Sequence, residues 1–219
     1  MLNVIAIDGP AASGKSSVAR LLAGRLGWNF VNSGALYRAY AWACLKAGVP
    51  PEEESQVAEA AVSWDVTCGI EDGRSWVAVA GARLESELDA GATNAAVSLV
   101  ARVPQVRALV VGQLRGFAEQ GGLVMEGRDI GTVVFPGTPW KFYIDASAEV
   151  RQQRRAAQGL DDRVSERDRV DSSRKAAPLS VAEGALVIDS SEMSVEEVVD
   201  RVLWHVGGAL GTPAREENV

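Results

Sequence analysis

The chain has 219 residues, which is long enough for one domain with a full hydrophobic core. Its formal net charge of −7 argues against a nucleic-acid partner, because contact with a phosphate backbone needs a basic face. Two cysteines, Cys44 and Cys68, are too few and too scattered for a disulfide framework or a metal site, so a reducing compartment is expected. No stretch approaches the length of a membrane span, and a strand expected from Leu2 leaves no room for a signal peptide. We therefore expect a cytoplasmic protein that does not bind membranes.

The most informative stretch lies near the start of the chain. Residues 4–8 (VIAID) are typical of a buried strand, and residues 9–16 (GPAASGKS) match the pattern G-x-x-x-x-G-K-[ST]. Apolar spacing then predicts a helix, which completes the strand–loop–helix context of a P-loop. Lys15 can reach the β- and γ-phosphates, and the Ser16 hydroxyl can ligate Mg²⁺. The sequence therefore predicts a site for a nucleoside triphosphate, with these candidate residues: Gly9, Pro10, Ala11, Ala12, Ser13, Gly14, Lys15, Ser16 and Ser17.

The next segment continues the alternation of strands and helices. The first helix should end near Gly27, a typical C-terminal glycine cap. Residues 28–31 predict a short strand, and Ser33 is the expected N-cap of a helix that runs to about residue 47. A short helix is expected at residues 52–63, with Pro51 in its first turn.

The alternation is interrupted at residues 64–85. Residues 64–68 and 75–79 have the composition of strands, and Asp72-Gly73 between them is a hairpin signal. A short strand at residues 82–84 would complete a small antiparallel sheet. We interpret this region as an inserted subdomain.

The second half of the chain returns to the α/β pattern. Helices are expected at 90–101, at 104–120, from Ser147 and from the capping box at Ser194, and strands at 122–125, 140–145 and 185–189. The fold class predicted is α/β, with a five-stranded parallel sheet and helices on both faces, so ligands should bind beyond the carboxyl ends of the strands. The single histidine, His205, lies in the last helix and is interpreted as a packing or surface residue.

Five motifs occur in one order along the chain. They are residues 7–10 (IDGP), 33–38 (SGALYR), 126–136 (EGRDIGTVVFP), the group Arg167, Asp168, Asp171 and Arg174, and residues 177–179 (APL). On these motifs, nearly the whole chain resembles bacterial cytidylate kinases of the P-loop nucleoside monophosphate kinase superfamily. The resemblance implies one P-loop kinase domain over residues 1–219, with an insertion that binds the monophosphate at about 36–103 and a short lid at about 155–172.

The chemistry of that family fits the residues available. A nucleoside monophosphate supplies its own anionic oxygen as the nucleophile, so no general base is needed. Catalysis then depends on positioning and on charge neutralisation by Lys15, Mg²⁺ and arginines. The resemblance implies transfer of a phosphoryl group from ATP to CMP and dCMP, giving CDP and dCDP, with Mg²⁺ as the cofactor and a monomer as the working unit.

The resemblance also assigns roles in the acceptor site. Arg38 and Arg128 match residues that bind the α-phosphate, and their fork geometry suits bidentate contacts; a helix-face ion pair and a strand-end salt bridge are their alternatives. Ser33 and Tyr37 belong to the same motif, and Tyr37 is equally explained by packing. Asp129 can accept a hydrogen bond from the exocyclic amine of cytosine, a donor that uracil lacks. The base-contacting set is Ser98, Arg107 and Asp129, with a helix-interior serine as the alternative for Ser98.

The lid region supplies further candidates. Arg167 and Asp171 match residues that hold the ribose, and Arg174 matches one that reaches the phosphates. Arg154 and Arg155 are candidates for the ATP side, and the turn at residues 189–191 is expected near adenine. The catalytic set predicted is Lys15, Arg128, Arg155 and Arg174.

The sequence departs from the family pattern in three places. The segment between Arg155 and Arg167 is short, which leaves the individual assignments of Arg154, Arg155 and Arg163 open. Glu126 stands where Asp is frequent, and its carboxylate keeps a possible role toward Mg²⁺ through water. Asp89 stands where relatives often carry Arg.

Three other functions are weighed against this one. Another small-acceptor P-loop kinase, for UMP, dTMP or AMP, is the closest alternative, and residues 126–136 count against it. A nucleotide-dependent switch protein is disfavoured because the chain has no N-K-x-D guanine motif. An inactive binding protein is disfavoured by the intact Lys15, Ser16, Arg38 and Arg128.

Overall fold

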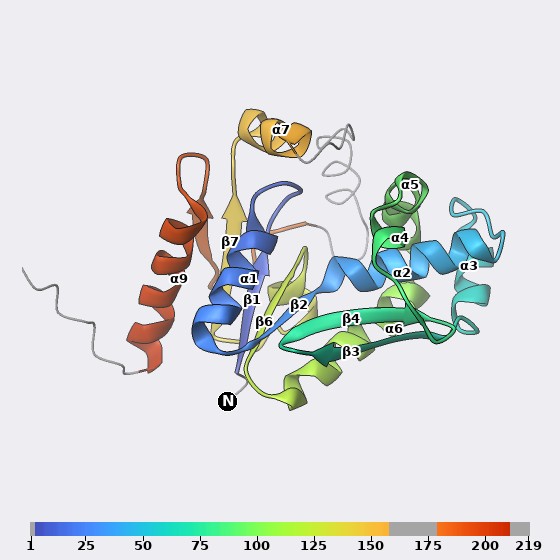
Figure 1. The fold of residues 1–219 in the computed structure, drawn as a ribbon, viewed down its shortest axis with the longest axis horizontal. Coiled ribbons are helices and arrows are strands. Elements are labelled where there is room, and N and C mark those ends of the chain that lie inside the picture. The colour runs from blue at the N-terminus through green and yellow to red at the C-terminus, as the bar shows by residue number, and fades with distance from the viewer. Residues whose placement is uncertain (1–2, 158–178, 211–219) are drawn as a thin grey trace, which may run out of the picture.

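A computed structural model, shown in Figure 1, describes residues 3–157 and 179–210 of the protein. Its centre is a parallel sheet of five strands in the order β2, β6, β1, β7, β8. These strands are Asn29–Asn32 (β2), Leu123–Gly127 (β6), Val4–Asp8 (β1), Trp140–Asp145 (β7) and Leu186–Asp189 (β8). The predicted α/β class and five-stranded parallel core are confirmed.

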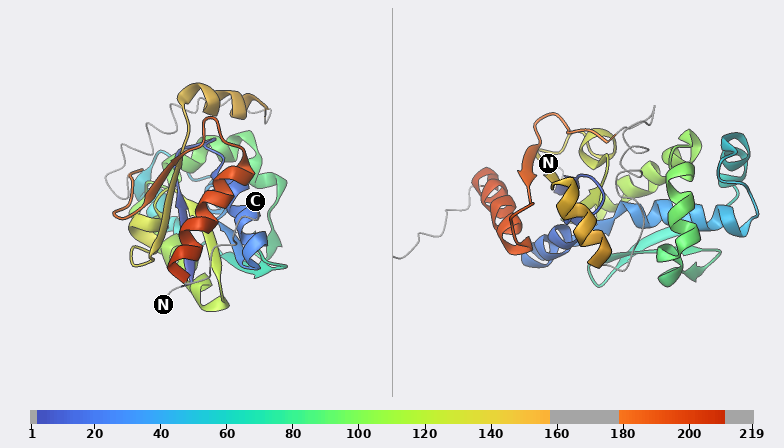
Figure 2. Two further views of the ribbon diagram at one scale, coloured as in Figure 1. Left: turned by 90° about the vertical axis from the view of Figure 1, so that its left-hand side faces the viewer. Right: turned by 90° about the horizontal axis from the view of Figure 1, so that it is seen from above.

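Helices cover both faces of the sheet, as Figures 1 and 2 show. Helices α1 (Lys15–Leu26) and α9 (Val195–Leu210) pack together over one face. Helices α2 (Ser33–Lys46), α5 (Gly91–Val100) and α6 (Pro104–Gly116) form the second cluster over the other. Because both faces are covered, all five residues of β1 are buried, which explains its apolar run over residues 4–7.

The hairpin predicted near residue 72 is present, but it does not form a separate sheet. Strands β3 (Val66–Glu71) and β4 (Arg74–Val79) pair antiparallel across Asp72 and Gly73, whose φ angles of 50° and 71° are those of a tight hairpin turn. Strand β4 lies beside β2, and the backbone N–H of Phe30 donates to the Gly73 carbonyl at 2.8 Å. The hairpin thus extends the central sheet, because it satisfies backbone groups on the outer edge of β2. A short β5 (Ala82–Arg83) pairs with β4.

Several helix boundaries differ from the prediction. The helix expected at 52–63 is shorter, Glu54–Ala61 (α3), and Pro51 precedes it. An unpredicted turn of helix, α4 (Ser86–Asp89), comes before α5. The helix expected at 104–120 ends at Gly116 and continues as a 3₁₀ turn, Phe117–Gln120 (η1).

The N-cap predicted at Ser33 is wrong. The cap of α2 is Asn32, whose side-chain oxygen accepts a hydrogen bond from the Ala35 N–H at 3.2 Å. Ser33 instead donates its hydroxyl proton to the Glu126 carbonyl at 2.8 Å. Asn competes well for the cap because its short side chain reaches the third backbone N–H. The capping box at Ser194 is confirmed, with reciprocal bonds to Glu197.

The segment after β6 forms a short π-helix, η2 (Ile130–Val134), that the sequence did not predict. Helix α7 (Ala148–Ala157) follows β7 and lies above the P-loop in Figure 1. Within the described ranges, no single helix is long and apolar enough to cross a membrane; one bent pair, Gly91–Val100 with Pro104–Gln120, passes by length and composition only.

Candidate active site

The P-loop wraps the carboxyl end of β1 with backbone geometry that few residues tolerate. Gly9 has φ 152°, and a Cβ there would lie 2.1 Å from the Ile144 carbonyl oxygen. Gly14 has φ 90° and its carbonyl accepts the Val18 N–H at 3.1 Å, which begins α1. Both fixed glycines of the pattern are therefore required by the backbone conformation. A loop that turns its N–H groups toward an anion needs such conformations.

Lys15 and Ser16 lie at the start of α1. Lys15 is buried, and its ammonium group donates to the Pro10 carbonyl at 2.7 Å. The Ser16 hydroxyl donates to Glu126 Oε1, also at 2.7 Å. Glu126 lies on β6 beside Ile7 of β1, so a hydroxyl from the start of α1 meets a carboxylate from the end of a strand. Oxygen donors of this kind suit Mg²⁺, which takes few protein ligands and binds mainly to substrate phosphates.

The potential metal ligands are arranged as expected for a magnesium ion that binds few protein groups. In the part of the chain that the structure describes, no group of three or more His, Cys, Asp or Glu side chains is placed to hold a metal ion. A complete protein cage is therefore absent from those residues. Ser16 and Glu126 are suitable for a magnesium ion that arrives with a triphosphate.

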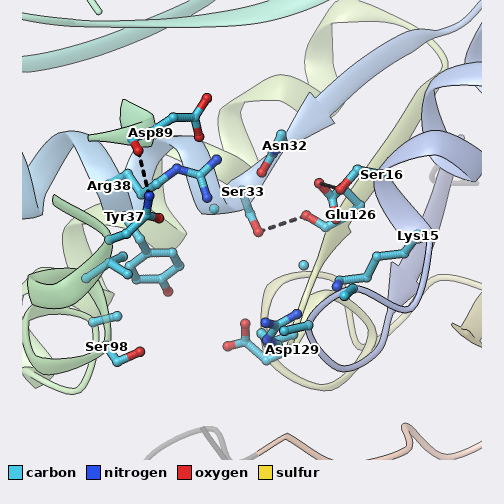
Figure 3. Close-up of a pocket in the computed structure, with 18 of the residues that line it drawn as sticks. Lys15, Ser16, Asn32, Ser33, Tyr37, Arg38, Asp89, Ser98, Glu126 and Asp129 are labelled. Carbon is cyan, nitrogen blue, oxygen red and sulfur yellow. Dashed lines mark hydrogen bonds between the residues drawn. The ribbon is translucent and has the colours of Figure 1, made fainter. Parts of the chain in front are cut away.

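A cleft of about 500 Å³ opens between the P-loop and helices α2 and α5 (Figure 3). It brings together residues that are far apart in the sequence but were predicted to share a site. Its polar lining includes Lys15, Ser16, Asn32, Ser33, Tyr37, Arg38, Asp89, Asn94, Ser98, Glu126, Arg128, Asp129 and Arg155.

Both phosphate-binding candidates line this cleft. Arg38 lies on the first turns of α2, and Arg128 follows β6. The Arg128 guanidinium donates to the Gly9 carbonyl at 2.8 Å, so it reaches the P-loop. The two guanidinium groups thus border the space between the loop and the acceptor side, as phosphate recognition requires.

The base-reading candidates form a buried ion pair. Arg107 on α6 bonds to the Asp129 carboxylate, and both side chains are buried. Arg107 also donates to the Ala101 carbonyl at 3.3 Å, and its guanidinium lies 5.5 Å from the centre of the Tyr37 ring. Asp129 and Ser98 line the cleft, whereas Arg107 lies behind them. The structure therefore places Arg107 against Asp129 and not at the cleft surface.

A second cavity, of about 530 Å³, lies on the outer side of the P-loop. Arg154 connects the loop to the turn after β8, because its guanidinium donates to the Ser13 carbonyl at 3.2 Å and to the Ser190 carbonyl at 2.7 Å. Arg155 lines both cavities. The turn at residues 189–191 was predicted near the donor base, and its Ser190 lines this cavity together with Met193, Ser194, Val195 and Val198.

Four residues at or beside the site were missed from the sequence: Asn32 and Asn94, which line the cleft, and Arg151 and Asp8, which adjoin the P-loop. Arg151 donates to the Ala11 carbonyl at 3.3 Å, and its place at the head of an arginine-rich helix was the available signal. Asp8 is buried at the end of β1, and burial raises its pKa to about 6. Its carboxylate accepts the N–H groups of Ile130 and Gly131 at 2.8 and 2.7 Å. A lone carboxylate in an otherwise apolar strand was the signal for it.

Other residues named from the sequence lie away from the cleft or outside the residues that the structure describes. Arg163, Arg167, Asp171 and Arg174 fall in residues 158–178, outside the described ranges. His205 is exposed on α9 and packs edge-on to Phe142, as expected for a surface residue. The thiols of Cys44 and Cys68 are free, and burial raises the pKa of each to about 11.

Comparison with known proteins gives close matches over nearly the full length. A cytidylate kinase of Methylococcus capsulatus is 43% identical over 207 residues, covering 90% of this chain and 93% of that protein. Cytidylate kinases of Stutzerimonas stutzeri and Vibrio vulnificus are 42% and 40% identical, covering 93% and 94% of this chain and 94% and 96% of those proteins.

Similar solved structures support the architecture. A sugar kinase from Janibacter sp. HTCC2649, in its unliganded structure, has a TM-score of 0.51 at 16% identity, over 97% of this chain and 98% of that chain. A gluconokinase from Sinorhizobium meliloti 1021 has a TM-score of 0.50 at 13% identity, over 97% of both chains. At such low identity these likenesses show the fold alone. The family model described as cytidylate kinase matches residues 5–207. Together with relatives at 40–43% identity, that match shows that the chain belongs to the cytidylate kinase family.

Proposed function

We propose that the protein transfers the γ-phosphoryl group of MgATP to CMP and dCMP, giving CDP and dCDP. One observation carries this proposal: a single cleft joins Lys15 and Ser16 of the P-loop to Arg38, Arg128 and the buried Asp129. Membership of the cytidylate kinase family supports the same activity and does not favour a kinase for UMP, dTMP or AMP.

The reaction needs alignment more than proton transfer. An oxygen of the acceptor's phosphate attacks the γ-phosphorus in line, and the bond to the β–γ bridging oxygen breaks. Lys15 neutralises charge on the donor phosphates, while Arg38 and Arg128 hold the acceptor phosphate at attacking distance. Magnesium would supply positive charge that neutralises the donor phosphates. Ser16 would ligate it directly and Glu126 would hold one of its waters.

Base selection follows from the buried carboxylate. Asp129 accepts a hydrogen bond from the exocyclic amine of cytosine, and Arg107 holds that carboxylate in place from behind. Uracil presents a carbonyl at the same position, which would leave two acceptors face to face. A buried acceptor without a donor is costly, so the site discriminates against UMP. Ser98 would contribute a second contact to the base.

The remaining assignments complete the proposal. Arg167 and Asp171 hold the acceptor ribose, and Arg155 and Arg174 reach the transferring phosphoryl group as a lid over about residues 155–172 closes. Residues 36–103 form the insertion that binds the monophosphate within a single P-loop kinase domain over 1–219. We further propose that the protein works as a monomer in the cytoplasm, without nucleic-acid or membrane partners.

An acceptor panel tests the proposal. Steady-state phosphorylation by MgATP should be measured with CMP, dCMP, UMP, AMP, dTMP and shikimate at matched concentrations. The expected result is that CMP and dCMP exceed every other acceptor in kcat/KM by at least about tenfold, the discrimination that one buried hydrogen bond supplies. A better acceptor outside the cytidine pair would overturn the assignment, and the absence of any turnover would overturn the enzyme class.

A further inference from the structure

We propose that Asp8 is a positioning residue that fixes the acceptor loop, residues 127–131, to the carboxyl end of β1. The acceptor loop carries Arg128 and Asp129, the residues assigned above to the acceptor's phosphate and base. This inference rests on the proposed function and adds to it a group that touches neither substrate. Its role is to hold the two halves of the cleft in register.

The connection consists of three hydrogen bonds, all donated by the acceptor loop to the end of β1. Asp8 Oδ1 accepts the Ile130 N–H at 2.8 Å, and Asp8 Oδ2 accepts the Gly131 N–H at 2.7 Å. In the same direction, the Arg128 guanidinium donates to the carbonyl of Gly9 at 2.8 Å. Two consecutive residues at the end of β1 thus bind three groups of one neighbouring loop. We call this arrangement the β1 latch.

The geometry of the acceptor loop depends on the latch. Asp8 stands directly beside Gly127 in the parallel pairing of β1 with β6, so the two strands end at the same level of the sheet. A Cβ at Gly131 would lie 3.3 Å from Asp8 Oδ2, a closer approach than most side chains accept. The two N–H groups held by Asp8 immediately follow Asp129, so the latch fixes the direction in which Arg128 and Asp129 leave the strand.

The charge on Asp8 is costly, which argues that it is kept for a reason. Burial raises its pKa to about 6, the two N–H bonds and Lys15 lower it, and Asp129 raises it. Two other titratable groups come from β7, the strand packed beside Asp8. Lys141 lies near Gly131, and Tyr143 is the register partner of Asp8. Ionised Asp8 accepts both N–H bonds, whereas the protonated acid presents one O–H toward an N–H donor. Strongly perturbed groups of this kind are typical of functional sites.

The substitution Asp8→Asn tests the latch. An amide keeps one acceptor oxygen but turns an NH₂ group toward the second N–H, so one hydrogen bond is lost. We expect kcat/KM for CMP to fall about 10- to 100-fold, the change that a lost buried hydrogen bond produces. The Kd of MgATP, measured by calorimetry without acceptor, should change by less than about threefold, since the P-loop itself is intact.

A pH profile separates positioning from a merely structural role. Below about pH 6 the acceptor phosphate takes up a proton, because a phosphate monoester has its second pKa near 6. For the wild type, Asp8 adds a second proton, so log kcat/KM for CMP should fall with a slope that approaches two over about one to two pH units, the range that a 10- to 100-fold loss spans. Asp8→Asn should retain only the slope of one that belongs to the substrate.

Asp145→Asn is the matched control. Asp145 ends the neighbouring strand β7, and its carboxylate accepts the N–H of the adjacent Ala146 at 2.8 Å within its own turn. This variant should keep the wild-type kcat/KM for CMP and the slope of two. If Asp8→Asn fails to fold by circular dichroism, Gly131→Ala disturbs the same latch from the other side and should lower kcat/KM for CMP in the same way.

The outcomes separate the two proposals. A folded Asp8→Asn protein with the wild-type kcat/KM for CMP, or with a slope of two, overturns the latch and leaves the proposed function standing. A wild-type protein that does not phosphorylate CMP overturns both. A loss of MgATP affinity equal to the loss in kcat/KM would show that Asp8 supports the whole P-loop, and would also overturn the latch.

Discussion

The donor half of the cleft is formed by one loop and its backbone, whereas the acceptor half is assembled from side chains of four separate elements. On the donor side, residues 9–16 are contiguous, and their shape follows from two glycines and the start of α1. On the acceptor side, Arg38 comes from α2, Ser98 from α5, Arg107 from α6 and Asp129 from the loop after β6. One half therefore depends on local conformation and the other on the packing of distant segments.

The cationic side chains show the same contrast. Around the donor loop they are already gathered on its carbonyls: Arg128 on Gly9, Lys15 on Pro10, Arg151 on Ala11 and Arg154 on Ser13. On the acceptor side, Arg107 is paired with a carboxylate. Cations held on the loop carbonyls stand where donor phosphates would bind, whereas the buried Arg107–Asp129 pair shapes the base site. We therefore expect substitutions in the donor half to remove turnover and those in the acceptor half to change selectivity.

Lys15→Met should have the largest effect. Methionine keeps the apolar length of the buried side chain but removes the charge that neutralises the transferring group. We expect kcat to fall about 10³-fold, which corresponds to about 4 kcal/mol of lost transition-state stabilisation. Single-turnover phosphorylation of CMP measures this. A kcat within tenfold of the wild type would contradict the donor role of Lys15, provided that the melting temperatures agree.

Asp129→Asn should change selectivity more than turnover. The amide can donate to the carbonyl of uracil, so the ratio of kcat/KM for CMP to that for UMP should fall about 10- to 100-fold. Competition between CMP and UMP in one reaction measures the ratio directly. An unchanged ratio would show that Asp129 does not read the base.

A double-mutant cycle sharpens this test. Arg107 and Asp129 are both buried, so removal of either partner alone leaves a buried charge or its hydrogen-bonding groups uncompensated. Arg107→Met and Asp129→Asn should therefore each destabilise the fold by about 3 kcal/mol, and the double variant by clearly less than their sum. Urea denaturation of the four proteins gives the coupling. Additive losses would mean that the pair is not an energetic unit.

Arg154→Met should have a smaller effect, confined to the donor. Its guanidinium joins the P-loop to the turn at Ser190 beside the second cavity. We expect the KM for MgATP to rise about three- to tenfold, the net worth of one typical hydrogen bond, with the KM for CMP unchanged. Arg20→Met is the matched control, because Arg20 lies on the surface of α1 against the Phe30 ring. Equal changes in both variants would point to net charge as the cause.

The donor half of the cleft could be predicted from the sequence more fully than the acceptor half. The P-loop could be predicted because its binding groups belong to consecutive residues whose conformation is set locally. Ser33 was misassigned as a cap because Asn32 and Ser33 are both suitable caps, and only the approach of β6 shows that Ser33 bonds to Glu126.

The role of long-range pairing explains the other differences. The hairpin was predicted from Asp72-Gly73, yet its pairing with β2 depends on an edge that no local pattern reveals. The bonds of Asp8 join residues more than 120 positions apart in the sequence, so a lone acidic residue in a strand was visible while its partner was not. Residue types at the site were thus predictable, and their hydrogen-bond partners were not.

The smallest effects should come from the hairpin, which belongs to neither half of the cleft. Gly73 has φ 71°, so Gly73→Ala forces a side chain into the left-handed region and should cost about 1 kcal/mol, or about 2–4 °C in Tm. Gly112→Ala is its matched control, because Gly112 is exposed within α6 with nothing near its missing Cβ, and should stabilise by about 0.5–1 kcal/mol. Thermal unfolding with kcat for CMP measured on the same samples checks both. A change in kcat that follows Tm in either variant would show that the cleft depends on overall stability, and the division between a local donor half and a packed acceptor half would then be wrong.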